Sequence, residues 1–384
     1  MDIVNIFNKD AVRGTFIIML PVGISFYTFQ TASYVIDVYK GKIKSEKHFG
    51  YYALFVTYFP QLVAGPIERP ENLLPQLKAE KKIKEVDYAS AMRIMLVGFF
   101  KKIAVADIIG IAVNATYSKI GDANGLSILI ATILFAFQIY CDFSGYSDIA
   151  MGCSKLFGVN LTENFNDPYA STSVKEFWGR WHISLSNWLK DYIYIPLGGS
   201  KKGIWRWVLA ITVTFLFSGL WHGANYTFVV WGLLFAALQI IEKFLNPQLV
   251  KLETKMHISQ TSTGLKIARI VKTFLIVCFC WIFFRANTIG DAGIAISKLF
   301  TGWTNLDQTF NLLSLNLHKL IYIPVALLLL YVADRIKNNS KIFGWKGHWT
   351  FRYAIYLVFA ACIVCAWFYL QASNIGSSFI YFQF

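Results

Sequence analysis

Two histidines, each following a tryptophan, are the residues of this chain best placed to carry out chemistry. His222 lies in FSGLWHGANY, where an apolar run meets a small, polar segment flanked by glycines. An ionisable side chain at membrane depth is costly and usually marks a transport route or a reaction. Because a neutral imidazole accepts a proton near neutral pH, His222 is predicted to act as general base toward an acceptor hydroxyl that attacks an acyl ester or thioester.

Small residues around His222 suggest how a substrate reaches it. Gly219 and Gly223 carry no side chains, which is expected to leave room beside the imidazole. Ser218 lies one helical turn earlier on the same face, so a Ser–His pair of nucleophile and base is conceivable. Direct attack by the acceptor is preferred, because side chains on adjacent turns often share only a hydrogen bond.

The second histidine, His182, lies in the polar stretch from 152 to 202, in the segment FWGRWHISLSNWLKDYIYIPLGG. Arg180 and Asp191 lie nearby in the same segment. At helical spacing the segment presents one stripe, made of Trp178, Trp181, Leu185, Trp188 and Leu189. The stripe favours an amphipathic helix at the membrane interface. That interpretation leaves His182, one residue from the stripe and so near the interior, unexplained.

The aspartates and cysteines in or beside the apolar runs are predicted to have structural roles. Asp142 and Asp148 flank a Ser-Gly pair at the end of an apolar run, which predicts a helix end with Asp148 capping the next segment. The six cysteines lack paired CxxC sets and are predicted to be reduced packing residues, with no metal site. The sequence contains no HxxxxD box, no GxSxG elbow and no Gly-rich phosphate loop. The soluble enzyme classes that use these motifs are therefore unsupported.

Membrane helices must position these residues. Of 384 residues, 56% are hydrophobic and 15% charged, whereas soluble proteins have roughly a quarter charged residues. Several apolar runs approach the roughly 20 residues that cross a bilayer. The formal charge of +14 comes from short basic clusters between these runs, which favours positive cytoplasmic loops over nucleic-acid binding. The prediction is an all-α polytopic protein of the cytoplasmic (inner) membrane, with a single domain over residues 1–384.

The apolar runs give the candidate membrane segments. They are residues 14–38, 51–67, 103–117, 126–145, 205–221, 226–241, 273–284, 320–332 and 353–370. Several are shorter than a full crossing, so tilted or re-entrant helices are expected where protein or water shields the backbone.

Basic residues set the expected orientation, since cytoplasmic loops carry the excess of Lys and Arg. The connections over 243–272 and 335–352 are rich in these residues, whereas the stretch between them holds only Arg285, Lys298 and Lys319. The basic connections are therefore predicted to be cytoplasmic and the intervening stretch external. The segment starting near residue 205 then runs outward to His222, while the topology of the N-terminal third stays open.

Several segments, in order along the chain, resemble the alginate O-acetylase branch of the membrane-bound O-acyltransferase (MBOAT) family. They are LPVGISFYTFQ (20–30), QLVAGPIERP (61–70), YCDFSGYSDIAMG (140–152), NFNDPYASTSVKEFW (164–178), WHISLSNWLKDYIYIPLGG (181–199), GLWHG (219–223) and IYFQF (380–384). Together they span most of the chain, so the resemblance is specific.

The resemblance implies a fold and a reaction. The implied fold is a ring of tilted transmembrane helices with re-entrant or interfacial helices around a central tunnel. The implied activity is transfer of acetyl groups from a cytoplasmic donor, acetyl-CoA, to hydroxyls of an exported polysaccharide, directly or through a periplasmic or surface acetyltransferase partner. No tightly bound cofactor and no metal are expected.

The resemblance also implies site residues. The histidine of the family's WHG motif corresponds to His222 and that of its WHIS motif to His182, the expected catalytic pair. Donor and acceptor are expected to be positioned by Arg180, Trp181, Asp191 and Trp221.

The chain departs from the family's pattern at several positions. Gly179 and Lys190 stand where the family often has arginines, and Arg and Lys are not equivalent for bidentate contacts. Family members usually have further membrane spans before LPVGISFYTFQ, whereas residues 1–19 alone precede it here. The resemblance therefore implies that these N-terminal spans are missing.

Two other functions fit parts of the pattern. A related branch moves D-alanine from a carrier protein onto teichoic acid and shares the two-histidine plan, so its donor is what distinguishes it. A transporter of lipid-linked sugars would also place polar residues in apolar segments. Transporters often contain an internal repeat, which the sequence does not show.

Overall fold

The computed structural model describes residues 23–338 and 349–373, and every regular element within them is a helix. The helices before the histidine-rich region are α2 (Ile24–Tyr39), α3 (Phe49–Thr57), α4 (Pro70–Lys78), η1 (Ile83–Glu85), α5 (Tyr88–Phe99), the π-helix η2 (Phe100–Asp107), α6 (Ile108–Tyr117) and α7 (Gly125–Leu156). Those after it are α10 (Ile204–His222), α11 (Tyr226–Lys255), α12 (Thr263–Arg285), α13 (Ile289–Lys298), α14 (Leu306–Leu312), α15 (Leu317–Asn338) and α17 (Trp349–Ala372). The predicted all-α class is confirmed.

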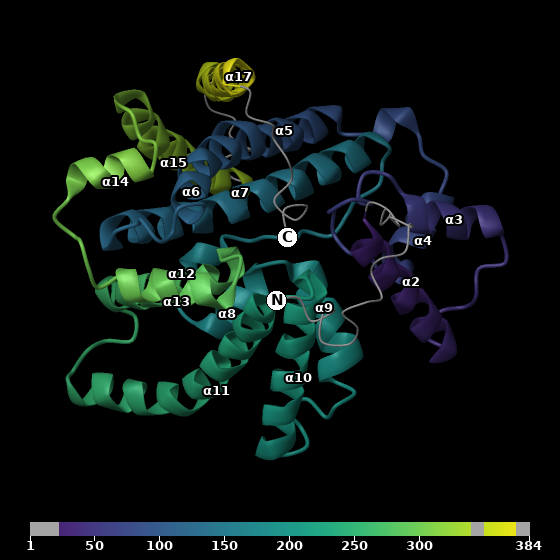
Figure 1. Ribbon diagram of the computed structural model, residues 1–384. Coiled ribbons are helices and arrows are strands. Elements are labelled where there is room, and N and C mark those ends of the chain that lie inside the picture. Colours follow the sequence, from purple (N-terminus) through teal and green to yellow (C-terminus); the bar gives the residue numbers. More distant parts are fainter. Residues whose placement is uncertain (1–22, 339–348, 374–384) are drawn as a thin grey trace, which may run out of the picture.

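Short helices lie between these two groups in the chain. They are η3 (Pro168–Ala170), α8 (Val174–Arg180), α9 (Ile183–Leu189) and the π-helix η4 (Lys190–Tyr194). Figure 1 shows α9 near the middle of the view, with α10 and α11 below it, α5 to α7 above it and α2 to α4 to its right. The longer helices therefore surround the segment that carries His182.

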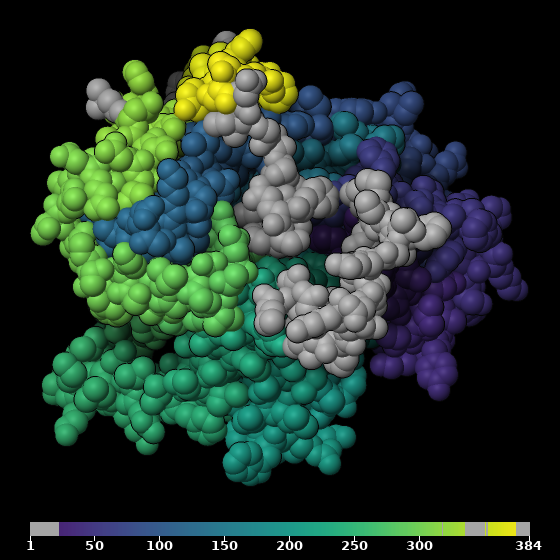
Figure 2. All heavy atoms as spheres, viewed as in Figure 1, coloured from purple at the N-terminus to yellow at the C-terminus, as the bar shows by residue number. Residues whose placement is uncertain are grey.

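Among the described residues, five helices are long and apolar enough to cross a membrane: α7, α10, α11, α12 and residues 352–372 of α17. Helix α17 stands at the edge of the molecule, where it packs on α5 and η2 (Figure 2). Its outward side chains are large and apolar, with Leu357 70% and Phe368 67% exposed. Such a surface is unfavourable in water and suits the hydrocarbon of a bilayer.

The predicted segments differ most from the structure at residues 51–67. Helix α3 ends at Thr57, and the chain leaves helical geometry at Tyr58, where ψ is 102°. Pro60 follows shortly, and a proline disfavours helical backbone in the residue before it. The prediction of a membrane helix over 51–67 is therefore wrong, and the second half of this run is a loop. The predicted segment 14–38 begins outside the described residues.

Helix α7 is longer than predicted and forms the scaffold of the molecule. Asn124 and Ser127 form a capping box at its start, and the helix then runs unbroken to Leu156. The helix end predicted near Asp142 and Asp148 is wrong. Gly145 does not make a turn there. A Cβ atom on it would lie 2.8 Å from the carbonyl oxygen of Gly98, so this glycine allows the backbones of α5 and α7 to approach closely.

Both aspartates of α7 pair with lysines of η2. Lys101 Nζ lies 3.0 Å from Asp148 and 2.8 Å from Asp334 of α15, while Lys102 Nζ binds Asp142 and, at 2.9 Å, Asp107. The Lys101 and Asp148 side chains are each only 1% exposed. Ions removed from water this completely persist only when partners satisfy them. The aspartates therefore bind helices together and do not end them.

Breaking this buried ion network should destabilise the protein strongly. Replacing Lys101 with Met removes the cation that bridges Asp148 and Asp334, and breaking a buried pair of this kind costs roughly 3–5 kcal/mol. Thermal unfolding in detergent should show a clearly lowered Tm. Lys82→Met is the control, because Lys82 belongs to a surface pair whose side chains are 74% and 70% exposed. Equal Tm values for the two variants would contradict the assignment.

Candidate active site

The segment carrying His182 is bent and does not form one long helix. Helix α8 ends at Arg180, α9 starts at Ile183, and His182 between them has a left-handed backbone with φ of 43°. The N-terminus of α8 is held from α11, because Glu242 accepts hydrogen bonds from the backbone N–H groups of Val174 and Lys175, each at 3.1 Å. These bonds satisfy donors that a helix start leaves unpaired.

The predicted interfacial stripe is therefore wrong in two ways. The bend at His182 splits it, and all of its members are buried in the protein core: Trp178, Trp181, Leu185, Trp188 and Leu189. Trp181 stacks on Phe177 with ring centroids 5.5 Å apart, and Trp188 donates its indole N–H to the carbonyl of Phe29 at 2.9 Å. The aromatic residues pack the interior and fix the position of the histidine between them.

Asn164 fixes the orientation of the His182 ring. Its Oδ1 accepts hydrogen bonds from the backbone N–H and the hydroxyl of Ser184, at 3.2 and 2.7 Å, and lies 3.2 Å from Nδ1 of His182. Because a backbone N–H can only donate, this Asn164 atom is the oxygen, so Nδ1 of His182 carries the proton. Nε2 is then the lone-pair atom of the neutral ring.

The Nε2 atom of His182, which holds the lone pair, is buried in the protein core. The side chain is 1% exposed, and Nε2 has no hydrogen-bond partner among the described residues. Burial, with a smaller contribution from His222, holds the pKa of His182 well below its usual range. His182 is therefore neutral at physiological pH and offers Nε2 as an acceptor.

His222 lies at the last position of α10 and contacts rings from several elements. Its ring centroid lies 5.2 Å from that of Trp231 on α11 and 5.0 Å from that of Phe284 on α12, both near perpendicular. The side chain is only partly buried. The turn that follows is made by Gly223, with φ of 156°, and Asn225 then caps α11 by accepting a hydrogen bond from the Thr227 N–H.

Trp221 joins the two histidines. Its ring centroid lies 5.9 Å from that of His182 and 4.8 Å from that of His222. It also stacks on Phe29 of α2 at 5.5 Å. The structure thus brings His182, Trp221 and His222 together, although 40 positions separate the histidines in the sequence.

The glycines beside His222 serve helix packing, which corrects the expectation that they leave room for substrate. A Cβ on Gly219 would lie 2.3 Å from the carbonyl oxygen of Phe228, and one on Gly223 would lie 2.9 Å from the Phe228 ring. On the facing helix, a Cβ on Gly232 would lie 2.3 Å from the carbonyl oxygen of Phe215. Helices α10 and α11 thus touch backbone to backbone.

Ser218 makes no hydrogen bond within the described part of the chain, and its Oγ is buried. The Ser218–His222 pair of nucleophile and base is therefore not formed in this structure. Direct attack by an acceptor remains the simpler chemistry.

The charged residues predicted to position substrates lie in separate ion pairs. Arg180 pairs with Glu176 at 2.6 Å, one turn away in α8. Asp191 pairs with Arg69 at 2.9 Å, which joins η4 to the loop before α4. The first pair lies within one helix and the second links two elements, and neither pair includes a histidine.

Sequence reasoning missed Asn164 and Arg69 as parts of this arrangement. Both lie inside segments that carry the family resemblance, NFNDPY and IERP. The resemblance marked the segments, but the three-dimensional contacts were needed to show which side chain holds which ring or carboxylate.

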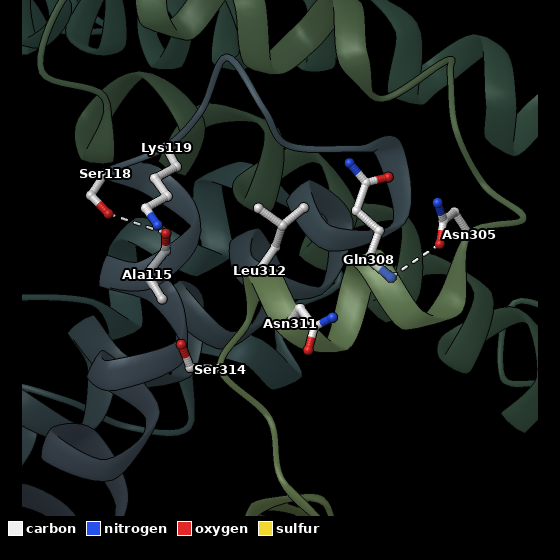
Figure 3. Close-up of a pocket in the computed structure, with 8 residues that line it drawn as sticks. All are labelled: Ala115, Ser118, Lys119, Asn305, Gln308, Asn311, Leu312 and Ser314. Carbon is white, nitrogen blue, oxygen red and sulfur yellow. Dashed lines mark hydrogen bonds between the residues drawn. The ribbon is translucent and has the colours of Figure 1, made fainter.

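A separate pocket of about 520 Å³ lies between the end of α6 and α14. Figure 3 shows its polar lining, including Lys119, Gln308 and Asn311, and neither histidine is among the residues that line it. Across residues 23–338 and 349–373 no cluster of His, Cys, Asp or Glu could hold a metal ion. The histidine arrangement is therefore the best candidate for a reaction.

Comparison with known proteins places this arrangement in a family. The family model for "MBOAT, membrane-bound O-acyltransferase family" matches residues 43–285. The chain belongs to this family. The match includes both histidines, and membership together with the apolar helices makes this MBOAT protein a multi-pass membrane protein.

The individual relatives are named for different acceptors. The MBOAT chain is 36% identical over 304 residues to "Probable alginate O-acetylase AlgI" of Pseudomonas fluorescens, covering 78% of this chain and 59% of that protein. It is 31% identical to "Peptidoglycan O-acetyltransferase" of Helicobacter pylori, covering 85% and 68%. It is 28% identical to "Teichoic acid D-alanyltransferase" of Bacillus subtilis, covering 69% of each. The chain thus spans between 52% and 62% of the length of these alginate O-acetylase relatives.

Removing the Asn164 carboxamide should loosen the His182 ring. Asn164→Ala leaves the Ser184 N–H and the His182 Nδ1–H without their acceptor, and each unpaired buried donor costs about 1–3 kcal/mol. The Tm in detergent should fall. Asn166→Ala is the matched control, since this exposed asparagine lies two positions further on. An unchanged Tm for Asn164→Ala would show that the network does not hold the ring.

Crowding the contact between α10 and α11 should also destabilise the protein. Gly219→Ala places a methyl group against the Phe228 carbonyl, and overpacking of this kind costs roughly 1–3 kcal/mol. Gly179→Ala is the control, because nothing lies within 4 Å of a Cβ atom there. Thermal unfolding of both variants in the same detergent tests the difference, and a Tm for Gly219→Ala as high as that of Gly179→Ala would refute the close contact.

Proposed function

We propose that this chain is an O-acetyltransferase in which His222 activates the attacking hydroxyl. The observation that carries the proposal is the placement of two imidazoles around one indole, with His222 at the end of a membrane-spanning helix and His182 neutral and buried. Acyl transfer needs a base that is neutral in its resting state and sheltered from bulk water. An imidazole can take up a proton near neutral pH, and the rings of Trp231 and Phe284 flank His222 and shelter part of it from water.

In the proposed reaction the acceptor hydroxyl attacks the carbonyl carbon of an acetyl thioester. His222 takes the hydroxyl proton as the new C–O bond forms, and the carbonyl electrons move onto oxygen. The intermediate then collapses, the C–S bond breaks, and His222 returns the proton to the leaving thiolate. His182 supports the donor through the Nε2 lone pair, and the Trp221 ring lies between the two imidazoles.

Acetyl-CoA is the proposed donor, with no tightly bound cofactor. The acceptor is proposed to be an exported polysaccharide, because relatives named for alginate and for peptidoglycan O-acetylation match this chain better than those named for teichoic acid D-alanylation. A periplasmic or surface acetyltransferase could receive the acetyl group before the polysaccharide does. The protein is proposed to lie in the cytoplasmic membrane.

The remaining predicted residues have supporting roles in this proposal. Arg180 stabilises α8 internally through Glu176, and Asp191 ties η4, which follows α9, to Arg69. Trp181, the residue before His182, fills the core and packs on Trp281 with ring centroids 5.1 Å apart. These residues fix the geometry in which the donor binds.

The acetyl content of surface polysaccharide tests the proposal. Cells lacking the native protein would carry either this chain or its His222→Ala variant at matched membrane levels. Loss of a general base lowers the rate by about 10²- to 10⁴-fold, so the variant should restore almost no acetyl ester. His48→Ala, which removes an exposed histidine, should behave like the parent chain.

Other outcomes would point elsewhere. Equal restoration by the parent and His222→Ala would overturn the mechanism and favour a transport role. Appearance of D-alanyl esters in place of acetyl esters would identify a carrier-protein donor. Restoration by no form of the chain would refute the proposed acceptor.

A further inference from the structure

The core beside His222 contains buried polar atoms that the protein itself does not satisfy. Nε1 of Trp178, Oγ of Ser218 and Nε1 of Trp231 have no hydrogen-bond partner among the described residues. They come from α8, α10 and α11, the helices that enclose this part of the core. Buried indole N–H groups usually find an acceptor, so an exception calls for an explanation.

Trp231 is the most isolated of the three from solvent. Its side chain is fully buried, and its ring meets the His222 ring at an angle of 89° with centroids 5.2 Å apart. Its other ring neighbours include Phe235 at 5.3 Å and Phe284 at 5.2 Å. These two phenylalanines have no oxygen or nitrogen atom that could accept its proton, and Trp178, at 5.7 Å, offers only an N–H donor.

A neighbouring tryptophan shows that this core can satisfy an indole. Trp281 stacks on Trp231 with centroids 6.0 Å apart and is equally buried, at 1% exposure. Its N–H donates to the Tyr169 hydroxyl at 3.2 Å. Of these two stacked indoles, the one in contact with His222 is the one whose donor is unused.

We propose that the indole N–H of Trp231 donates a hydrogen bond to the acyl carbonyl oxygen during transfer. The inference rests on the proposed function and names a further catalytic residue for it. When the acceptor oxygen attacks, the carbonyl electron pair moves onto oxygen, which becomes negatively charged while His222 takes the hydroxyl proton. Trp231 stabilises that charge, and the bond weakens again when the intermediate expels the thiolate.

The energetics favour such a role. An unpaired buried donor costs about 1–3 kcal/mol in the resting protein. A donor already fixed in a dry site needs no reorganisation when charge develops, so it favours the transition state over the ground state. The alternative is that the N–H points at the face of a neighbouring ring, a weak interaction that would contribute to stability and not to rate.

The test replaces the nitrogen and keeps the ring. Incorporating benzothienylalanine at position 231, where sulfur takes the place of N–H, preserves the size and packing of the side chain. The same replacement at Trp281 is the matched control, since it removes an N–H that is already satisfied by Tyr169. Purified protein in liposomes would be assayed for transfer from radiolabelled acetyl-CoA to a soluble polysaccharide, with Tm measured in parallel.

We expect the replacement at Trp231 to lower kcat by about 10²-fold, in the range for loss of one oxyanion donor. The KM for acetyl-CoA and the Tm should stay as in the parent protein. The replacement at Trp281 should lower Tm and leave kcat unchanged. A parental kcat for the Trp231 replacement, or a raised KM with parental kcat, would overturn the inference.

A second readout does not depend on turnover. The ¹⁵N resonance of the Trp231 indole, assigned by its loss in Trp231→Phe, should shift when a ketone analogue of acetyl-CoA binds, and that of Trp281 should not. Binding without a shift at Trp231 would refute the contact. If His222→Ala abolishes transfer while the Trp231 replacement does not slow it, the proposed function stands and this inference alone fails. Absence of both transfer and binding would overturn the two together.

Discussion

The pairing of Lys101 with Asp148 and Asp334 is the constraint on which the helical assembly depends. It joins charges from η2, α7 and α15 at a point where the Lys101 and Asp148 side chains are each only 1% exposed. Asp334 also accepts a hydrogen bond from Tyr140 at 2.9 Å. Since none of these ions is stable alone in an apolar interior, the three helices must assemble in one register. The long helix α7 then serves as the fixed wall against which the histidine-bearing segment is folded.

Close backbone contacts complete the assembly where side chains would hold helices apart. Gly98 and Gly145 bring α5 onto α7, and Gly219 and Gly232 bring α10 onto α11. Small residues at such crossings are the usual means of packing helices in a bilayer, where lipid offers no hydrophobic drive for association. The second crossing fixes the last turn of α10, which carries His222, against α11.

Sequence patterns were sufficient for the parts of the structure that depend on local chemistry. The end of α10 at His222 followed from the glycine-flanked break, and the cost of an ionisable group in an apolar run singled out His222. His182 was singled out because an interfacial helix left it unexplained. The bend at His182 could not be predicted, because its flanking tryptophans have the spacing of one continuous amphipathic helix. Similarly, Asp142 resembled a helix end until its partner Lys102, 40 positions away, was known. Such partnerships depend on tertiary contacts that one sequence does not display.

The left-handed backbone at His182 has an evolutionary consequence. A residue with a Cβ atom pays about 1 kcal/mol for this conformation, whereas glycine adopts it freely and asparagine tolerates it better than most. The ring offsets this strain, because its Nδ1–H donates to Asn164 at 3.2 Å and it packs on Phe143 with centroids 4.6 Å apart. Glycine at position 182 would relax the backbone but leave a cavity in the core, so packing alone selects against that substitution.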